Sequence, residues 1–243
     1  MTRLSVNLNK VCLLRNSRGG NSPDPLDAAR ACIAAGAQGL TLHPRADVRH
    51  ATLEDVIAFA GLPEVASGAV ELNVEGDLRP ELMRCAYEVG AHQFTVVPVM
   101  PGEVTSSRGW RAYDDHDGLA AAVRFFNGKL RVSVFCDATE TSVAYAARAG
   151  ADAVEFYTGA FAQAFGTPAG DALLEDLGRA ADYARSLGLR VHAGHDLDTV
   201  NLPACLARLK PDEVSIGHAI IADTLVHGLG PTVKRYLEVM AGG

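Results

Sequence analysis

The chain has 243 residues, of which 48% are hydrophobic and 21% are charged, and its formal net charge at pH 7 is -7. This composition is typical of a globular protein and argues against a disordered chain. The acidic balance argues against a nucleic-acid partner, because nucleic-acid-binding proteins normally carry a basic face. Residues 1–10 lack a signal-peptide core, and no apolar run reaches the roughly 18 residues of a membrane span. Five scattered cysteines fit a reducing compartment, so we expect a cytoplasmic protein with no membrane partner.

Short apolar runs alternate with Ala-rich or amphipathic runs along the whole chain, which is the pattern of strands followed by helices. Ala-Gly-Ala at 35–37 and 149–151 and Val-Gly-Ala at 89–91 predict helix ends, because glycine adopts the left-handed conformation that often ends a helix. The expected strands are 4–9, 39–43, 69–75, 94–97, 130–135, 153–156, 189–192 and 213–216. The expected helices are 26–35, 53–60, 81–89, 118–126, 139–149, 173–186, 202–209 and 225–240.

These elements form eight β/α units, which predicts a TIM (β/α)8 barrel with its active site at the carboxyl ends of the strands. A doubly wound open sheet is the alternative. It is less favoured, because the first strand is not followed by a Gly-x-Gly-x-x-Gly motif. No linker divides the units, so we expect residues 1–243 to form a single domain.

The strands alternate between apolar and polar positions, and in a barrel one set faces the helices while the other points inside. The set expected to face outward is Leu4, Val6, Leu40, Leu42, Val154, Phe156, Val214 and Ile216. The set expected to point inward is Ser5, Asn7, Thr41, His43, Asn73, Glu75, Glu155, Tyr157, Ser215 and Gly217. A purely structural barrel fills its interior with branched apolar side chains. The polar interior therefore predicts a functional cup, with a structural hydrogen-bond network as the alternative.

The stretch at 40–50 is an apolar strand that ends in two histidines and two arginines. The strand breaks at Pro44 and so delivers His43 to its end. Arg45 and Arg49 are suited to bind phosphate through several fixed donors. His43 or His50 is suited to transfer protons near neutral pH. The alternative is a solvated loop with ordinary surface charges.

Two carboxylates lie at the ends of predicted strands, Glu75 on the third and Glu155 on the sixth. Both can share the cup with His43, and a set of this kind is what general acid and base catalysis needs. The alternative is that each carboxylate is buried for structural reasons and is satisfied by arginine or by backbone amides.

The His192-Ala-Gly-His195 segment invites a zinc interpretation, but positions i and i+3 of one strand point to opposite faces. His43, His195 and His218 could bind a metal together, yet no Asp or Cys spacing supports a metal site. We therefore expect no metal, and a proton-donor role for His195.

Gly194-His195 and Gly217-His218 follow the seventh and eighth strands, where barrels commonly bind phosphate through backbone amides and a helix N-terminus. As ordinary turns these glycines would need no ligand. The connection at 98–113 is long enough to act as a lid. Trp110 within it would either cover a bound substrate or anchor the connection.

Taken together, these residues resemble the pyridoxine 5'-phosphate synthase family through nearly the whole chain. So many matches in order are specific, although any single one is weak. The resemblance is carried by Val6-Asn7, 14–19, 42–45, Arg49-His50, 73–75, Val97-Pro98, 103–105, 134–137, Thr158-Gly159, 193–195 and 215–221.

The resemblance implies a TIM barrel that assembles as a homooctamer and needs neither a metal nor an organic cofactor. It implies condensation of 1-deoxy-D-xylulose 5-phosphate with 3-amino-2-oxopropyl phosphate, which yields pyridoxine 5'-phosphate, inorganic phosphate and water. By matching position, His43 and Glu75 resemble the proton acceptors, His195 the proton donor and Glu155 a transition-state stabiliser. Contacts to the aminoketone phosphate are implied for Asn7, Arg18, Gly217 and His218, and contacts to the deoxyxylulose phosphate for Arg45, His50 and Thr105.

The sequence departs from the commoner family pattern at four positions. Asn9-Lys10 stands where many members have Asp-His, Tyr157 where many have His, and Asp196 where a Gly often follows the catalytic His. We still count Asn9, Lys10 and Asp196 among the candidate substrate contacts. Two alternative functions remain open: another phosphosugar isomerase or aldolase on the same barrel, and a non-catalytic protein that binds a phosphorylated metabolite.

Overall fold

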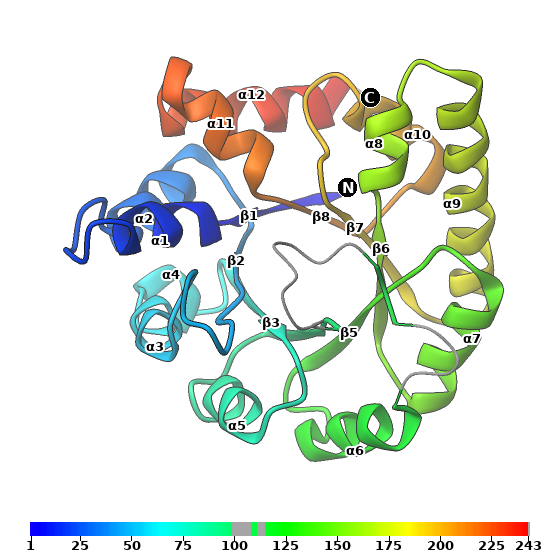
Figure 1. Cartoon of the computed structure of the whole chain (residues 1–243), viewed down its shortest axis with the longest axis horizontal. Coiled ribbons are helices and arrows are strands. Elements are labelled where there is room, and N and C mark those ends of the chain that lie inside the picture. The colour runs from blue at the N-terminus through cyan, green and yellow to red at the C-terminus, as the bar shows by residue number, and fades with distance from the viewer. Residues whose placement is uncertain (99–107, 111–114, 243) are drawn as a thin grey trace.

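The computed structural model describes residues 1–98, 108–110 and 115–242, and its strands form a closed parallel barrel in the order β1 to β8 (Figure 1). β1 pairs in parallel with both β2 and β8, which closes the sheet. The helices lie around the outside of the strands. The predicted TIM barrel is therefore confirmed, and the open doubly wound sheet is wrong.

The elements alternate as the sequence predicts, with a few additional short helices. The strands are β1 (Arg3–Asn7), β2 (Gly39–Leu42), β3 (Glu71–Gly76), β4 (Gln93–Val96), β5 (Arg131–Cys136), β6 (Ala153–Tyr157), β7 (Arg190–Gly194) and β8 (Glu213–Ile216). The helices are α1 (Asn9–Asn16), α2 (Pro25–Ala35), α3 (Leu53–Ala60), α4 (Pro63–Ala66), α5 (Pro80–Glu88), α6 (His116–Phe126), α7 (Glu140–Ala149), α8 (Gly159–Ala164), α9 (Pro168–Ser186), α10 (Leu202–Leu209), α11 (His218–His227) and α12 (Leu229–Gly242).

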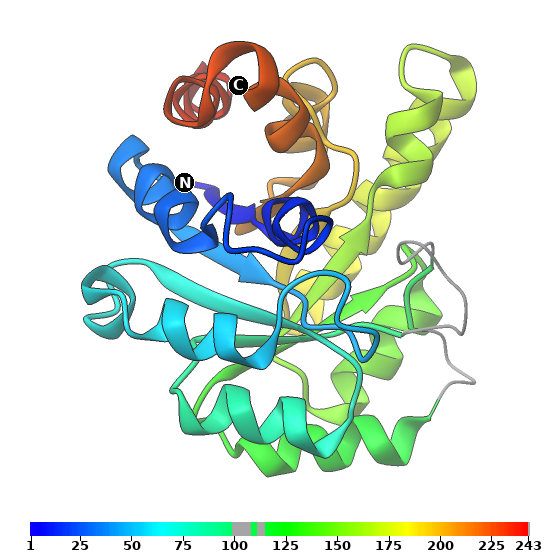
Figure 2. The ribbon, with the colours of Figure 1, turned by 60° about the vertical axis from the view of Figure 1, so that its left-hand side comes forward.

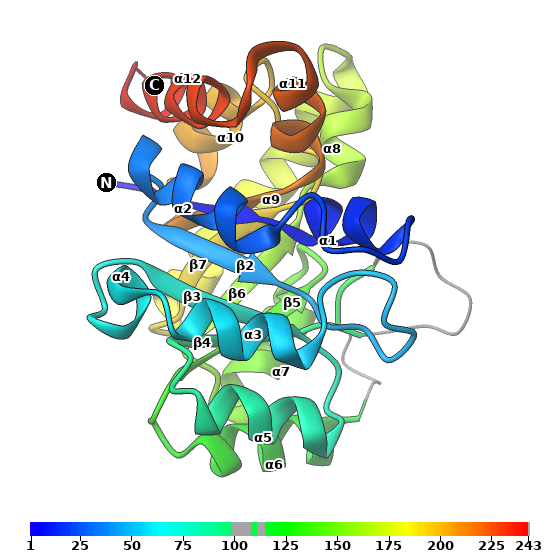
Figure 3. The same cartoon turned by 90° about the vertical axis from the view of Figure 1, so that its left-hand side faces the viewer.

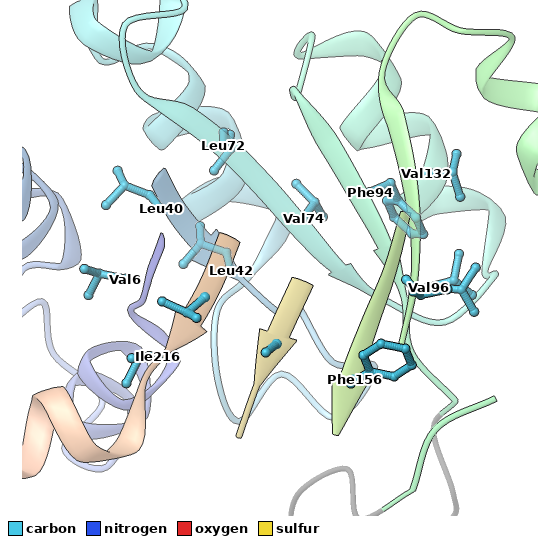
Figure 4. Close-up of a cluster of buried hydrophobic side chains, with 14 of the residues drawn as sticks. Val6, Leu40, Leu42, Leu72, Val74, Phe94, Val96, Val132, Phe156 and Ile216 are labelled. Carbon is cyan, nitrogen blue, oxygen red and sulfur yellow. The ribbon is translucent and has the colours of Figure 1, made fainter. Parts of the chain in front are cut away.

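The outward-facing strand residues form the main hydrophobic core between the sheet and the helices. Val6, Leu40 and Ile216 are at most 2% exposed, and they belong to one buried cluster with the apolar residues of the neighbouring strands (Figure 4). Burying such side chains stabilises a fold by about 1.5–3 kcal/mol each. The predicted alternation between the two faces is confirmed.

The barrel interior is polar, and its middle layer is a hydrogen-bond network. The hydroxyls of Ser5 and Thr41 lie 2.7 Å apart, and Thr95 Oγ1 donates to Asn73 Oδ1 at 2.9 Å. Because these buried groups hydrogen-bond to one another, the alternative of a structural hydrogen-bond network applies to this layer. The functional reading applies to the layer above it, at the carboxyl ends of the strands.

An ion network fills the opposite, amino-terminal end of the barrel. Glu71 accepts hydrogen bonds from both Arg3 and Arg131, and Arg3 Nη2 also lies 3.2 Å from Glu213 Oε2. These residues start β1, β3, β5 and β8, so the network ties distant parts of the chain together.

The first strand is shorter than predicted, because the chain turns after Asn7. Asn7 Oδ1 accepts the backbone N–H of Asn9 at 3.1 Å, and residues 9–16 form α1. The prediction that the first strand extends to residue 9 is therefore wrong.

Other boundaries also differ from the predictions. α4 and α8 are short helices that the sequence pattern did not indicate, and α9 begins at Pro168 after the capping side chain of Thr167. The predicted helix 225–240 is two helices that meet at Gly228, whose φ is +80°. Leu225 and Val226 are 82% and 79% exposed, so the apolar pattern there does not mark one buried face.

Glycines end the helices where the sequence predicts them. Gly36, Gly90 and Gly150 have φ values of +106°, +69° and +86°. Each leads the chain from a helix into the next strand, which confirms the predicted turns.

The helical layer closes around the barrel along with the sheet. Figures 2 and 3 show α3 and α5 side by side on the outside, and Figure 3 places α1 and α4 at opposite ends of the barrel. α12 packs against α2, so the last helix meets the first β/α unit. Among the described residues, no helix is both long and apolar enough to cross a membrane.

Candidate active site

A cavity of about 300 Å³ lies at the carboxyl ends of the strands. Twelve of the fourteen candidate site residues line it. They are Asn7, Asn9, Lys10, His43, Arg45, His50, Glu75, Glu155, His195, Asp196, Gly217 and His218.

The remaining two candidates are not brought to the cavity by the described structure. Arg18 lies exposed in the turn after α1 and is not among the described residues that line the cavity, so its predicted place in the site is not supported. The contact of Arg18 with the aminoketone phosphate stays a prediction. Thr105 lies outside the described residues, as does most of the predicted lid at 98–113.

Trp110 belongs to the described part of that connection and is 7% exposed. Its backbone N–H donates to the carbonyl of Phe135 at 2.7 Å, and it pairs with Cys136 beside the end of β5. It is not among the cavity-lining residues of the described chain. These contacts favour an anchoring role over a cover for substrate.

A chain of hydrogen bonds connects the two predicted proton acceptors, His43 and Glu75. Asn7 Nδ2 donates to Glu75 Oε2 at 3.2 Å, and Asn7 Oδ1 accepts from the backbone of Asn9. Asn9 Oδ1 in turn accepts the backbone N–H of His43 at 2.8 Å. His43 Nδ1 lies 3.8 Å from Glu75 Oε2, so the base at the end of β2 and the carboxylate at the end of β3 face each other.

His43 and His50 are both held in the neutral form. Burial lowers the pKa of His43 to about 3, with the nearby charge of Arg45 as the next cause. Burial and the charge of Lys10 lower the pKa of His50 to about 4. His43 Nε2 has no hydrogen-bond partner among the described residues. A buried neutral imidazole nitrogen of this kind is available to accept a proton or a hydrogen bond from a ligand.

The pKa values of the two glutamates in the cavity are raised, whereas those of His43 and His50 are lowered. Burial, with a contribution from Glu213, raises the pKa of Glu75 to about 7. Burial and the neighbouring Glu75 raise the pKa of Glu155 well above its usual value. A carboxyl that is half ionised near neutral pH is suited to take up and release protons. Gly194 makes room for Glu155, because a Cβ at this position would overlap Glu155 Oε1.

His195 lies at a backbone turn in which two successive residues are left-handed. The φ values of His195 and Asp196 are +83° and +56°, which non-glycine residues seldom adopt. The His195 ring packs against the rings of Tyr157 and Phe135, with centroids 5.2 and 5.8 Å away. The turn therefore directs the ring of His195 into the cavity beside Glu155.

Cationic groups and a helix N-terminus also face the cavity. Arg45 is 7% exposed and lines the cavity with Lys10 and His50, and the charges of Lys10 and Arg45 both act on His50. Gly217 also lines the cavity and is the N-cap of α11, where backbone N–H groups and the helix dipole favour an anion. A Cβ on Gly217 would lie 3.0 Å from Asn7 Cβ, so glycine permits this close approach.

Sequence reasoning did not place Val97, Phe135 or Ser215 among the site residues, although all three line the cavity. Val97 and Phe135 read as ordinary core residues because they are apolar and lie at strand ends. Val97 and Phe135 lie two residues beyond the inward-facing Thr95 and Ser133, so the alternation along each strand is the signal that could have found them. The described residues contain no group of three or more His, Cys, Asp or Glu side chains arranged to hold a metal ion, so the three-histidine alternative is not supported.

The comparisons with known proteins agree with this picture of the site and fold. The family model described as "Pyridoxal phosphate biosynthesis protein PdxJ" matches residues 4–242. The pyridoxine 5'-phosphate synthase of Xanthomonas oryzae pv. oryzae (strain PXO99A) is 44% identical over 253 residues, covering 99% of this chain and 97% of that protein. The pyridoxine 5'-phosphate synthase of Xanthomonas axonopodis pv. citri (strain 306) is 42% identical over 251 residues, covering 100% of this chain and 98% of that protein.

Among solved structures, phosphoribosyl anthranilate isomerase from Thermotoga maritima is similar with a TM-score of 0.65 and 14% sequence identity, over 100% of both chains. At this identity the likeness concerns the fold alone. The family match and the two relatives extend over almost the entire sequence, including every strand of the barrel. The chain therefore belongs to the PdxJ family of pyridoxal phosphate biosynthesis proteins.

Proposed function

We propose that this protein is a pyridoxine 5'-phosphate synthase. It condenses 1-deoxy-D-xylulose 5-phosphate with 3-amino-2-oxopropyl phosphate to give pyridoxine 5'-phosphate, inorganic phosphate and water. The observation that carries this proposal is the meeting of His43, Glu75, Glu155 and His195 in one cavity, in a chain of this family.

The proposed reaction consists of carbonyl condensation and proton transfer. An amine adds to a ketone, water and phosphate leave, and the ring closes, and each of these steps needs protons moved at fixed positions. Half-ionised Glu75 is suited to accept protons. His43 is the second proposed acceptor, because its buried Nε2 has no hydrogen-bond partner among the described residues. His195 is the proposed proton donor. Burial raises the pKa of Glu155 and so favours its protonated form, which can donate a hydrogen bond to negative charge that develops in the transition state. None of these steps calls for a metal or an organic cofactor.

Two phosphate esters need two anion-binding regions, and the cavity is lined both by cationic groups and by a helix N-terminus. We assign Arg45, Lys10 and His50 to the deoxyxylulose phosphate. We assign the start of α11, with Gly217 and His218, to the aminoketone phosphate. Asp196 places a carboxylate at the cavity wall, where it repels a phosphate but can accept a hydrogen bond from a substrate hydroxyl or amine.

The test is to incubate the purified, metal-stripped protein with both substrates and to follow pyridoxine 5'-phosphate and inorganic phosphate together. Equal amounts of both products, with none when either substrate is omitted, are expected. His43→Asn is expected to abolish formation of both products while the circular dichroism spectrum is unchanged. Product from a single substrate would instead identify an isomerase or aldolase. Binding of a phosphate ester without turnover would identify a binding protein.

We also propose that the protein assembles into a homooctamer, because the resemblance to the family implies it. Light scattering coupled to size-exclusion chromatography tests this part separately. A mass of eight chains supports it, and a monomer or dimer that is fully active contradicts it.

A further inference from the structure

The turn that carries His195 stores backbone strain. A left-handed conformation is unfavourable for a non-glycine residue, and here two such residues, His195 and Asp196, follow one another. Conformations of this kind persist only where the surrounding structure imposes them. Something must therefore hold this turn against relaxation.

Thr158, at the end of the neighbouring strand, holds the first half of the turn. Its backbone N–H donates to the carbonyl of Gly194 at 2.9 Å. Its hydroxyl lies 2.6 Å from the carbonyl oxygens of both Gly194 and His195, and is positioned to donate to either. Thr158 is completely buried, so water does not replace these bonds.

Asn201 holds the second half of the turn. Its Nδ2 donates to the carbonyl of Asp196 at 3.1 Å, and its Oδ1 accepts the backbone N–H of Asp198 at 3.0 Å. Asn201 is 3% exposed. Three successive carbonyls, of residues 194, 195 and 196, thus accept hydrogen bonds from two buried residues.

Both residues occupy N-cap positions, where a Thr or Asn side chain would ordinarily accept a backbone N–H of the helix. Thr158 is the N-cap of α8 and Asn201 the N-cap of α10, yet neither side chain caps its helix in the described structure. Thr52, Thr139 and Thr167 stand at N-caps too, and each accepts the expected backbone N–H of its own helix. The side chains of Thr158 and Asn201 are directed to the His195 turn instead.

The same segment also fixes the His195 side chain. Tyr157, which precedes Thr158, places its ring 5.2 Å from the His195 ring, and Phe135 packs on both. Neither Thr158 nor Asn201 is among the described residues that line the cavity, so any influence on substrate must pass through the turn.

From this geometry we infer that Thr158 and Asn201 are positioning residues for His195, holding its left-handed turn so that the imidazole faces the reacting atoms. The inference rests on the proposed function for its kinetic consequence. In this inference the strained turn orients the imidazole of His195. Relaxation toward an ordinary backbone conformation would rotate the ring away from Tyr157 and Phe135.

The experiment compares Thr158→Val, which keeps the shape but removes the hydroxyl, with Thr158→Ser, which keeps the hydroxyl. We expect kcat of Thr158→Val to fall about 10- to 100-fold, because small misplacements of a catalytic group have effects of this size. KM for both substrates is expected to stay within about twofold, since no substrate contact is lost. Thr158→Ser is expected to retain kcat within about threefold.

A second readout does not depend on catalysis. The rate at which diethyl pyrocarbonate modifies His195, resolved by peptide mass spectrometry, reports how far its ring is held in place. In Thr158→Val this rate is expected to rise about threefold or more, while the rate at His227, exposed at the end of α11, is unchanged. Asn201→Ala, which releases only the Asp196 carbonyl, is expected to change both readouts in the same direction, and it decides the matter if Thr158→Val does not fold.

The outcomes separate the two proposals. A wild-type protein that forms no pyridoxine 5'-phosphate contradicts the proposed function, and the His195 modification rates then decide the positioning role alone. A wild-type protein that turns over, with Thr158→Val and Asn201→Ala equal to it in kcat and in His195 modification, overturns the positioning role and leaves the function standing. Equal losses in Thr158→Val and Thr158→Ser would also overturn it, because the hydroxyl would then not be the active group.

Discussion

Glu75 is the residue whose chemistry depends most directly on its burial. An exposed glutamate is fully ionised at neutral pH and is a weak base, whereas a pKa near 7 allows a carboxylate to take a proton and to release it again. The pKa of Glu155 is raised in the same direction, by burial and by the neighbouring Glu75.

The first prediction concerns the pH dependence of the reaction. Because Glu75 must be ionised to accept a proton, kcat/KM is expected to rise with pH and to level off above an apparent pKa of about 7. Glu75→Gln is expected to lower kcat by about 10²- to 10⁴-fold and to remove this rise from the residual activity. Glu88→Gln, on the exposed surface of α5, is the control and should reproduce the wild-type profile. A rise that survives in Glu75→Gln would assign it to another group.

The second prediction separates binding from chemistry at Arg45. Removing a charged hydrogen-bond donor from a phosphate site loses about 1.5–3 kcal/mol, so Arg45→Ala is expected to raise KM for 1-deoxy-D-xylulose 5-phosphate about 10- to 100-fold. Its kcat should stay within about threefold. Arg124→Ala, on the exposed face of α6, is the matched control in steady-state kinetics. A fall in kcat with unchanged KM would place Arg45 in the chemistry instead.

For these residues the sequence predicted which side chains lie close together, but not their hydrogen bonds or the shifts in their pKa values. Strand alternation was enough to bring His43, Glu75 and Glu155 to one end of the barrel. It could not show that Asn9 binds the backbone of His43, because that contact depends on the turn after β1. Nor could it show the pKa shifts, which arise from burial and from charges on other strands.

At the scale of elements, several turns that connect a helix to the next strand share one backbone geometry. A left-handed glycine stops the helix, and the chain enters the next strand directly. Gly36 and Gly188 are two such positions, with φ values of +106° and +81°. They differ in surroundings: a Cβ on Gly36 would lie 3.1 Å from Leu237 Cδ1, whereas one on Gly188 would meet nothing within 4 Å.

The third prediction uses this difference. Gly188→Ala is expected to lower the free energy of unfolding by about 1 kcal/mol through backbone strain alone. Gly36→Ala is expected to lower it by about 1–2 kcal/mol, because the added methyl also displaces Leu237. Urea denaturation measures both, and kcat should be unchanged in each. A neutral or stabilising Gly188→Ala would show that its backbone relaxes to an ordinary conformation without penalty.

The elements that sequence analysis missed lie between the regular units. α1, α4 and α8 are short and have no side-chain N-cap in the described structure, so tertiary contacts rather than a long apolar period decide where they form. The division between α11 and α12 was missed because Leu225 and Val226 extend the apolar pattern although they lie exposed. The regular units were predictable because each repeats the same strand, helix and glycine signals.

At the scale of the whole molecule, buried carboxyls set how stability depends on pH. Glu75, Glu155 and Glu213 have raised pKa values in the folded state, so each is more stable when protonated. Their contribution is fully present below the unfolded pKa near 4.5, and for Glu75 and Glu213 it is lost as the pH rises through about 7. Glu71, bound by Arg3 and Arg131, has a pKa lowered to about 2, and its contribution is lost as the pH falls below 4.5 toward that value.

The fourth prediction is therefore a stability maximum near pH 5. For Glu75 alone, a shift from 4.5 to about 7 at about 1.4 kcal/mol per pH unit corresponds to at most about 3 kcal/mol. Glu75→Gln is expected to raise the free energy of unfolding at pH 8 by up to this amount and to leave it nearly unchanged at pH 4.5. Denaturation by urea at several pH values measures both. Greater wild-type stability at pH 8 than at pH 5 would contradict the proposed burial of these charges.

The pairing of β1 with β8 has a consequence for how the protein is made. Residues 3–6 of β1 pair with residues 213–216 of β8. One edge of β1 therefore stays unpaired until β8 has been synthesised. While the ribosome is still adding the intermediate units, β1 presents unpaired backbone groups that can pair with another nascent chain. The Arg3–Glu213 ion pair forms only at that final step. The barrel of this chain therefore cannot close until translation has passed the eighth strand.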